Sequence, residues 1–462
     1  MDVGALQRRI TGSVVQRTHP AYEPVRRALV WNELKPERYP ELIVHAASEA
    51  DVVATVEFAR VCGLRIAVRG GGHSWCAAAL RDGSILLDLA RLDAASIDAA
   101  ARTAVVQPVV RNRELAQRLG AHRLAFPLGH CSSVPVSGYL LGGGFGWNAG
   151  MWGPACFSVR ALDVVTADGR LRHGSSESEP DLFWAARGAG PGFFGVVTRF
   201  HLQVYPLPHT ISTSTYVYPL EELPAVVEWV NGAGPALSPA VEVALLLSAA
   251  PPQVTEGRVG DRPVCTVTAT AFVDTPAAAA TALAPLEDAP LAHTSLWSET
   301  RRATTFDGLY DDLDRFFPER HRYIADTVWS NTPGAEVLGA VRNHVAAAPS
   351  RKSLVLCAMP PPPPADAPAM PDAAFSMVGA TFVLCYAIWE EARDDAANRA
   401  WHERAMQLLE PFATGHYLGE SDIVATPSRA RGSFKPANWE RLRAVRNGYD
   451  PDGLFHGFFP EP

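Results

Sequence analysis

Two glycine-rich segments limit most strongly what this chain can fold into. Three consecutive glycines stand directly before His73, and a second glycine run covers residues 142–146. Glycine has no Cβ, so it adopts positive φ and lets the backbone approach a ligand closely. Successive N–H groups in such a turn form a concavity that binds anions. We therefore expect a ligand-binding loop before His73, and a pyrophosphate is a suitable anion for it.

The position of the first segment favours an α/β arrangement. Residues 64–68 have the pattern of a strand, so residues 69–74 form a strand-to-loop turn, where α/β proteins commonly bind phosphates. The turn does not match G-x-G-x-x-G at the start of a helix, because Trp75 and Cys76 follow it. A dinucleotide fingerprint of the Rossmann type is therefore not indicated.

A cysteine stands in a comparable setting further along. Cys131 lies in the segment Gly-His-Cys-Ser-Ser-Val at 129–134, shortly before the second glycine run. Taken singly, a Gly-Gly-Gly-His turn is commonly only a tight turn, and a lone cysteine among small residues is commonly an inert buried thiol. Together with the segments described below, the two motifs become specific.

Composition excludes several classes of protein. The chain has 462 residues, enough for two or more domains, and its 47% apolar and 19% charged residues are typical of globular proteins. The formal net charge is −8 without a long basic run, which argues against nucleic acid or an anionic membrane as a partner. No apolar run approaches the roughly 20 residues of a membrane-spanning helix.

The cysteine pattern and the first ten residues predict the cellular compartment of the protein. Seven cysteines are scattered without a C-x-x-C pair, which suits a reducing cytoplasm and predicts no zinc site or other metal site. The first ten residues lack the apolar segment of a secretory signal. We therefore expect a cytoplasmic protein.

The pattern of elements changes along the chain. Up to residue 205 it predicts helices over 49–62, between an N-cap at Ser48 and a C-cap at Gly63, and over 111–120, with strands near 65–68, 85–89, 103–106 and 194–204 and a hairpin turning at 167–169. Beyond residue 206 it predicts strands over 212–218, 241–248, 264–272, 353–359 and 381–389 and helices over 277–286 and 396–412.

Three further expectations concern the second half. The helix at 396–412 places Ala397, Trp401, Ala405, Leu408 and Phe412 on one apolar stripe, which we interpret as a core face. Five prolines at 360–364 predict a stiff exposed loop. Asn438 is expected to cap a last helix.

Seven segments in order resemble the berberine bridge enzyme-like group of the vanillyl-alcohol oxidase superfamily. They lie at 69–74, 129–134, 138–147, 161–169, 181–188, 194–200 and 438–443. The resemblance implies an α+β fold, with a two-part FAD-binding domain of the p-cresol methylhydroxylase type and a substrate domain in which an antiparallel sheet is backed by helices. The implied divisions are 1–205 for the first part of the FAD-binding domain, 206–424 for the substrate domain, and 425–462 for the segment that returns to the FAD-binding domain.

The same resemblance implies an FAD attached at two points. His73 would bond to the 8α-methyl carbon (8α-N-histidyl) and Cys131 to ring carbon C6 (6-S-cysteinyl). The residues carried over as cofactor-binding are Arg69, Gly70, Gly71, Gly72, His73, Ser74, Gly129, Cys131, Val134, Ser137, Gly138, Gly142, Gly144, Gly195 and Val197.

Candidate catalytic residues come from the segment at 416–420. Removing hydride from an alcohol carbon requires a base within hydrogen-bond reach of the hydroxyl proton. Tyr417 matches the tyrosine of the family's Tyr-x-Asn-Tyr-like segment, Gly419 replaces the asparagine, and Glu420 stands where some sugar-oxidising members carry a tyrosine. Glu420 is either a desolvated base with a raised pKa or a solvated loop residue, and both interpretations stay open. Tyr139 is a third candidate, because several relatives have a histidine there.

The function that this resemblance implies is that of an oxidase. Hydride would pass from a carbon of a sugar, oligosaccharide or small natural product to the flavin, with O₂ as acceptor and H₂O₂ as product, since the small Val134 tends to accompany oxidase behaviour in the family. A dehydrogenase using another acceptor, an enzyme that cyclises or desaturates a secondary metabolite, and a flavin-loaded carbohydrate- or partner-binding protein without turnover are the alternatives. Sequence leaves the substrate and the oligomeric state undetermined.

Overall fold

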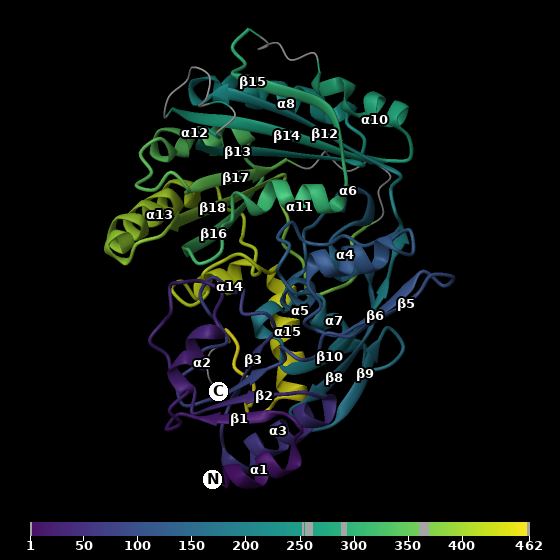
Figure 1. Ribbon diagram of the computed structural model, residues 1–462, viewed down its shortest axis with the longest axis vertical. Helices are drawn as coiled ribbons and strands as arrows, with labels where there is room; N and C mark the ends of the chain where they lie inside the picture. The colour runs from purple at the N-terminus through teal and green to yellow at the C-terminus, as the bar shows by residue number, and fades with distance from the viewer. Residues whose placement is uncertain (1, 252–253, 255–261, 288–292, 360–368, 460–462) are drawn as a thin grey trace.

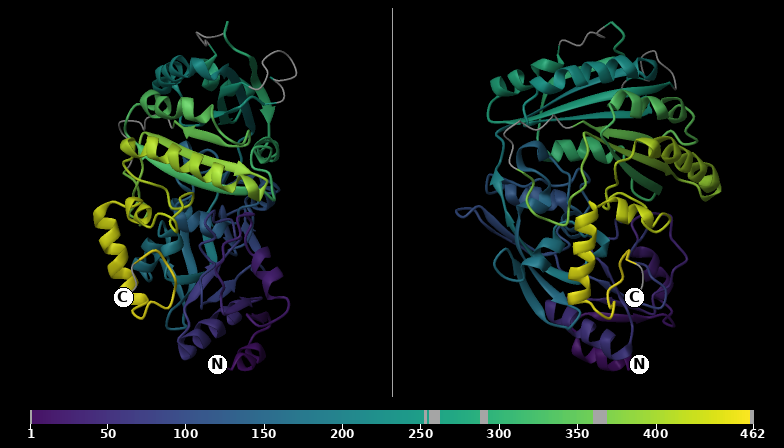
Figure 2. Two further views of the ribbon diagram at one scale, coloured as in Figure 1. Left: turned by 90° about the vertical axis from the view of Figure 1, so that its left-hand side faces the viewer. Right: turned by 180° about the vertical axis from the view of Figure 1, so that it is seen from behind.

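The computed structural model describes all residues except 1, 252–253, 255–261, 288–292, 360–368 and 460–462. The five-proline run at 360–364 thus lies outside the described residues. A lower part holds both ends of the chain, and an upper part is built on one large sheet (Figures 1 and 2).

A small mixed sheet in the lower part leads to the first glycine loop. Its strand order is β1-β2-β4-β3, in which β2, β4 and β3 run parallel and β1 is antiparallel to β2. Its strands and helices are β1 (Ser13–Gln16), β2 (Leu42–His45), β3 (Ile66–Arg69), β4 (Ile85–Asp88), α1 (Val3–Arg9), α2 (Tyr22–Ala28) and α3 (Glu49–Cys62). Ser48 caps α3 and Gly63 ends it with φ 65°, as the sequence predicts.

A second sheet of the lower part is fully antiparallel, in the order β5-β6-β10-β8-β9. Its strands are β5 (Ala95–Asp98), β6 (Thr103–Val106), β8 (Val159–Thr166), β9 (Leu171–Ser175) and β10 (Gly195–Gln203). A short pair joins β7 (Leu124–Ala125) to β11 (Tyr205–Pro206). The neighbouring helices are α4 (Asn112–Gly120), α5 (Val136–Gly142), α6 (Ala149–Trp152), α7 (Pro180–Ala186), α14 (Ser428–Gly432) and α15 (Pro436–Tyr449).

The upper part is a seven-stranded antiparallel sheet backed by helices (Figure 1). Its order is β15-β12-β14-β13-β17-β18-β16. The strands are β12 (Thr210–Pro219), β13 (Val241–Ala249), β14 (Pro263–Val273), β15 (Trp297–Thr304), β16 (Arg322–Ser330), β17 (Leu354–Ala358) and β18 (Thr381–Trp389). The helices are α8 (Leu223–Ala233), α10 (Pro276–Leu283), α11 (Phe306–Asp314), α12 (Gly334–Val345) and α13 (Asp395–Leu409).

Strand β18 shows how this sheet separates two environments. All nine of its residues are buried, as expected for a strand covered on both faces. Val383, Cys385 and Ala387 pack toward the helix layer, while Phe382 and Tyr386 join an aromatic cluster on the other face. The alternation follows from the two-residue period of a strand, and it directs every second side chain toward the lower part.

The last segment returns to the lower part, as Figure 2 shows. Phe455 pairs with Ile66 of β3 in a parallel bridge, and α15 packs beside α7. These contacts agree with the division into two halves, and the boundaries at 205 and 424 stay a prediction. None of the described helices combines the length and apolar character needed to cross a bilayer.

Several local predictions are wrong. Asn438 does not cap α15, since Lys435 precedes the helix and the Asn438 amide donates to the carbonyl of Ala373. Ala397 is exposed and does not belong to the buried face of α13. Trp401 and Ala405 belong to this face as predicted, and its other members are Asn398, His402, Met406 and Leu409. Strands β15 and β16 are absent from the prediction. β15 is a largely exposed edge strand rich in charge, so its sequence lacks the alternation of a half-buried strand.

The buried histidine of α13 predicts how stability depends on pH. Burial lowers the pKa of His402 to about 4, so between that value and about 6.5 the unfolded state binds more protons. We expect the free energy of unfolding to fall as pH drops through this window. Between pH 6.5 and 4.5 the His402→Gln protein should lose about 2 kcal/mol less unfolding free energy than the native protein, as measured by urea unfolding.

Replacing the exposed His122 by Gln is the matched control and should leave the pH dependence unchanged. An unaltered slope in the His402→Gln protein would contradict this assignment.

Candidate active site

Arg69 fixes the first glycine loop from its own side chain. The guanidinium donates to the carbonyls of Leu29, Gly70 and Gly71 and pairs with Asp88 at 2.7 Å. Gly72 has φ +74°, and a Cβ on it would lie 2.2 Å from the carbonyl oxygen of Leu29. Arg69 is thus committed to holding the loop, and Gly72 is required there by both conformation and space.

The loops that carry His73 and Cys131 lie directly against each other. A Cβ on Gly70 would fall 2.3 Å from the Ser137 hydroxyl, and one on Gly71 would fall 2.3 Å from the Pro135 ring. The imidazole of His73 interacts with the backbone of Ser133. Two motifs that are far apart in the sequence therefore lie against each other.

His73 presents a neutral imidazole. It stacks on Trp31 with ring centroids 4.9 Å apart and an interplanar angle of 27°. Burial, reinforced by Arg69 and Arg111, lowers the pKa of His73 to about 3. At neutral pH the ring thus keeps a lone pair on one nitrogen, which forming a bond to carbon requires.

Cys131 is held mainly as a thiol. Its Sγ lies 3.7 Å from the Ser133 hydroxyl, and its carbonyl accepts from the Asn112 side chain at 3.0 Å. Burial raises the pKa of this thiol, and Asp314 raises it further, while Ser133 opposes the change. The thiol therefore belongs to the loop that packs against that of His73, and its surroundings do not activate it strongly.

The second glycine run is shaped around Tyr139. A Cβ on Gly129, Gly144 or Gly146 would come within 3.0 Å of this ring or its hydroxyl. The Tyr139 hydroxyl donates to the carbonyl of Pro127. The hydroxyl proton of Tyr139 already forms a hydrogen bond, and its ring fills the space inside the loop. We therefore assign Tyr139 a structural role and no catalytic role.

The other residues carried over as cofactor-binding are spread around these loops. Ser74 accepts from the backbone N–H of Ala78, Gly138 is exposed, and Gly142 lies near Gly419 and the Tyr417 hydroxyl. Gly195 and Val197 belong to β10, where Val197 is buried in the core.

Tyr417 is buried against the second glycine run. Its hydroxyl accepts from the backbone N–H of Gly144 at 3.0 Å, which leaves its own proton available as a donor. Burial raises the pKa of this phenol, so it stays protonated at neutral pH.

Glu420 lies inside the site and is not a solvated loop residue. Its carboxylate accepts from the Trp75 indole N–H at 2.5 Å and from the Tyr386 hydroxyl at 3.2 Å. Burial raises the pKa of Glu420, and those two donors limit the rise. A carboxylate with this environment is suited to take a proton near neutral pH.

Aromatic side chains that the sequence did not single out pack against one another where the two halves meet. Trp31, Trp75 and Tyr323 lie with ring centroids 5.0–5.8 Å apart, and Tyr386 meets Trp75 at 5.8 Å. Tyr323 comes from β16, which the prediction lacks, and Trp31 precedes the whole motif set. Only the aromatic content of the chain hinted at them.

Two features suit the phosphates of an FAD. The Ser137 hydroxyl, beside Gly70, is buried without a hydrogen-bond partner among the described residues. A cavity of about 270 Å³ is lined by Arg38, Arg65, Arg81, Asp82, His456, Gly457 and Phe459. Arg81 donates to the carbonyl of Ala78 and Arg38 to that of Cys76, so the cavity borders the segment that follows the glycine loop. An unpaired hydroxyl and three guanidinium groups fit an anionic cofactor.

One cluster of metal-ligating side chains occurs among the described residues, away from this site. Asp163, His173 and His201 bring ligand atoms within 4.8 Å of one another on the lower antiparallel sheet. Arg199 also contacts the Asp163 carboxylate at 3.4 Å and already offsets its charge, so we assign the cluster no metal.

Comparisons with known proteins identify the family. The family described as FAD binding domain matches residues 40–175. The chain is 31% identical over 447 residues to the FAD-linked oxidoreductase nodO of Hypoxylon pulicicidum, covering 96% of each, and 34% identical over 199 residues to (R)-6-hydroxynicotine oxidase of Paenarthrobacter nicotinovorans, covering 43% of each.

Solved structures share the fold. Berberine bridge enzyme from Eschscholzia californica superposes with a TM-score of 0.83 at 17% identity, covering 98% of this chain and 97% of that one. 6-Hydroxy-D-nicotine oxidase from Arthrobacter nicotinovorans gives 0.83 at 23% identity, covering 98% of both. The fold and the site define an FAD-dependent oxidoreductase. The chain belongs to the FAD-linked oxidoreductases, and it shares the fold of berberine bridge enzyme.

The glycine loop allows a direct test. Replacing Gly72 by Ala should cost at least about 2 kcal/mol of unfolding free energy, through a positive φ and the collision with Leu29, and should lower the FAD content. Gly120, at the end of α4, has open space around it, so Gly120→Ala should be neutral or stabilising. Urea unfolding and the flavin-to-protein absorbance ratio measure both effects. Equal stability of the two variants would refute the account of this loop.

Proposed function

We propose that this oxidoreductase is an oxidase carrying FAD bonded to both His73 and Cys131, through 8α-N-histidyl and 6-S-cysteinyl links. Support comes from the neutral imidazole of His73 and from the contact between the two loops. Bound FAD supplies a two-electron acceptor for hydride from carbon, and that redox chemistry belongs to the cofactor.

The observation that carries the catalytic part of the proposal is the placement of Glu420. In its ionised form the carboxylate removes the proton of a hydroxyl or amine as hydride leaves the adjacent carbon. Trp75 and Tyr386 hold the carboxylate by two hydrogen bonds, which fixes its direction. Tyr417 keeps its proton and donates it as a hydrogen bond that orients the substrate.

The lining favours one class of substrate. Around Glu420 the described side chains are mainly aromatic, including Trp31, Trp75, Tyr323 and Tyr386. A sugar would need many polar partners for its hydroxyl groups, since buried polar groups without partners are costly. We therefore propose a small, largely apolar natural product with one reacting hydroxyl or amine, in preference to a sugar or an oligosaccharide.

The proposed electron acceptor is O₂, with H₂O₂ as product. Val134 follows Cys131 closely, and its backbone carbonyl is fixed by the N–H of Asn112 at 2.9 Å. None of the seven cysteines, all of which lie in the described residues, forms a disulfide, which is compatible with the cytoplasm as the proposed location.

The base is tested by Glu420→Gln, which keeps the side-chain shape and removes the charge. We expect the rate of anaerobic flavin reduction by substrate to fall roughly 10²- to 10⁴-fold. In the native protein the rate should rise with pH through a pKa above the ordinary 4.5 of a glutamate, because burial raises it, and the variant should lose this limb.

The exposed Glu403 on α13 offers the matched control, and Glu403→Gln should leave the rate and its pH profile intact. A Glu420→Gln enzyme with the native pH profile would assign the base elsewhere.

The acceptor is tested separately by reducing the flavin without oxygen and then mixing with air-saturated buffer. We expect reoxidation fast enough to sustain turnover, with about one H₂O₂ formed per flavin, since two electrons pass to each O₂. Reoxidation far slower than turnover would instead assign a different acceptor.

A further inference from the structure

The loop that carries Cys131 is held from both halves of the molecule. From the lower half, α4 contributes the N–H and side chain of Asn112 and the N–H of Arg113, which donate to the carbonyls of Val134, Cys131 and Ser132 at 2.9–3.1 Å. From the upper half, α11 contributes two contacts. The Tyr310 hydroxyl donates to the carbonyl of Gly129 at 3.2 Å, and the Asp314 carboxylate accepts from the Ser132 hydroxyl at 2.8 and 2.9 Å.

Tyr310 and Asp314 form one face of α11, since they are four residues apart. Tyr310 is fully buried, so its hydroxyl needs the partner that Gly129 provides. Both residues lie close to Cys131, since Asp314 raises the pKa of the Cys131 thiol and Cys131 raises the pKa of the Tyr310 hydroxyl. The contacts therefore fix the turn at the residue that would bond to FAD.

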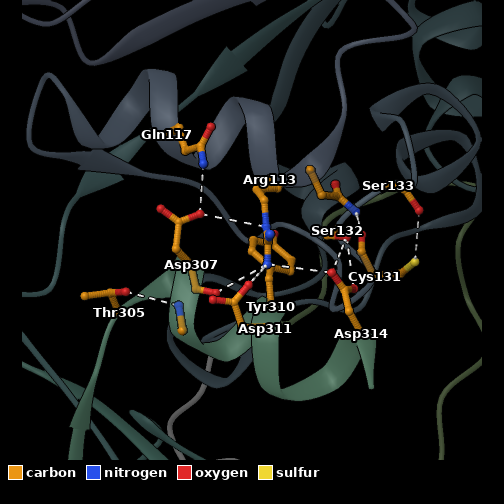
Figure 3. Close-up of polar contacts among 12 residues, drawn as sticks. Arg113, Gln117, Cys131, Ser132, Ser133, Thr305, Asp307, Tyr310, Asp311 and Asp314 are labelled. Atoms are coloured by element: carbon orange, nitrogen blue, oxygen red, sulfur yellow. Dashed lines mark hydrogen bonds and ion pairs between the residues drawn. The ribbon is translucent and has the colours of Figure 1, made fainter. Parts of the chain in front are cut away.

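An ionic cluster holds α11 in place on α4. Figure 3 shows the guanidinium of Arg113 among three carboxylates of α11. It lies 2.7 Å from Asp311, 3.6 Å from Asp314 and 3.8 Å from Asp307. Gln117, one turn along α4, also donates to Asp307 at 3.0 Å. Ion pairs as exposed as those to Asp307 and Asp311 contribute little singly, so the direct contacts to the loop carry the positioning.

We propose that Asp314 and Tyr310 of α11 are positioning residues for the attachment of Cys131 to FAD, so that the cysteinyl link depends on contact between the two halves. The inference rests on the proposed double attachment. His73 depends on other contacts, the stack on Trp31 and the glycine loop that Arg69 holds, and its link should form without α11.

The link is an oxidation. The C–S bond replaces the S–H bond of Cys131 and the C6–H bond of the ring, so two protons and two electrons are released. The electrons pass to the isoalloxazine ring and from it to O₂, the acceptor named above. Positioning matters because the sulfur must stay in line with one ring carbon, and loss of that orientation slows bond formation.

Asp314 could affect the attachment of Cys131 through its charge or by positioning the loop, and these two effects predict opposite results when Asp314 is replaced. The carboxylate raises the pKa of the thiol, so removing its charge alone would favour the reactive thiolate. Asp314→Asn keeps an oxygen that accepts from Ser132, whereas Asp314→Ala removes both the charge and the contact. The pair of variants therefore separates the two effects.

The experiment measures the ratio of doubly to singly attached FAD in full-length protein purified at a fixed time after induction, by mass spectrometry of proteolytic peptides. We expect the ratio to fall roughly tenfold in Asp314→Ala, equivalent to about 1.4 kcal/mol in the barrier, with the His73 link retained. Ser132→Ala and Tyr310→Phe should behave similarly, and Asp314→Asn should restore the native ratio.

Asp307→Ala is the control, because Asp307 contacts Arg113 and Gln117 and, within the part of the chain that the structure describes, forms no hydrogen bond or ion pair with the loop. A native ratio in Asp314→Ala and Ser132→Ala, with a doubly attached wild type, would overturn the inference alone. A wild type without any Cys131–FAD peptide would overturn the proposed double attachment and this inference with it. Loss of both links in Asp314→Ala, with a lowered melting temperature, would show general unfolding and contradict a selective role.

Discussion

The contact between the loop of His73 and the loop of Cys131 is the constraint on which the site depends. A side chain on Gly71 would collide with the Pro135 ring, and one on Gly70 would displace the Ser137 hydroxyl, so the two loops pack closely at both glycines. On its other side the first loop is fixed by Arg69, whose pairing with Asp88 ties it to the end of the parallel strands. The backbone is therefore rigid where it would meet a cofactor, and both candidate attachment residues project from it.

The second half of the molecule completes the site by burying its residues under aromatic side chains. Alternate side chains of β16 and β18 direct aromatic rings toward the glycine loops. This desolvation has opposite effects on two groups, since burial lowers the pKa of His73 and raises that of Glu420. One residue is thereby kept neutral as a nucleophile, and the other is brought toward the range in which a carboxylate exchanges protons at neutral pH. Helix α11 belongs to the same arrangement, because it joins the halves at the Cys131 turn.

Local rules predicted much of the fold. The caps at Ser48 and Gly63, the turn after β3 and the core strands of the large sheet depend on near neighbours in the sequence, and they are found as expected. Edge strand β15 was not predicted from the sequence, because most of its residues face solvent. Asn438 was misjudged because its amide binds Ala373, a partner about 65 residues away that no local pattern reveals.

The site was also predictable only in part, because its residues contact partners that lie far away in the sequence. The glycines at 129 and 144 looked like ligand-binding positions, yet their missing Cβ atoms make room for the ring of Tyr139. Sequence left open whether Glu420 is desolvated or solvated. The contacts that decide this come from Trp75, hundreds of residues away in the sequence, and from Tyr386, tens of residues away. Sequence identified the motifs that meet, whereas the surroundings that set their chemistry arise from the packing of the two halves.

The most direct test of the account is to denature the purified protein in acid and digest the precipitate. We predict a yellow pellet, and a single FAD that crosslinks the peptide containing His73 to the peptide containing Cys131. Release of all the flavin into the supernatant would contradict the central claim that these two loops hold one cofactor by covalent bonds.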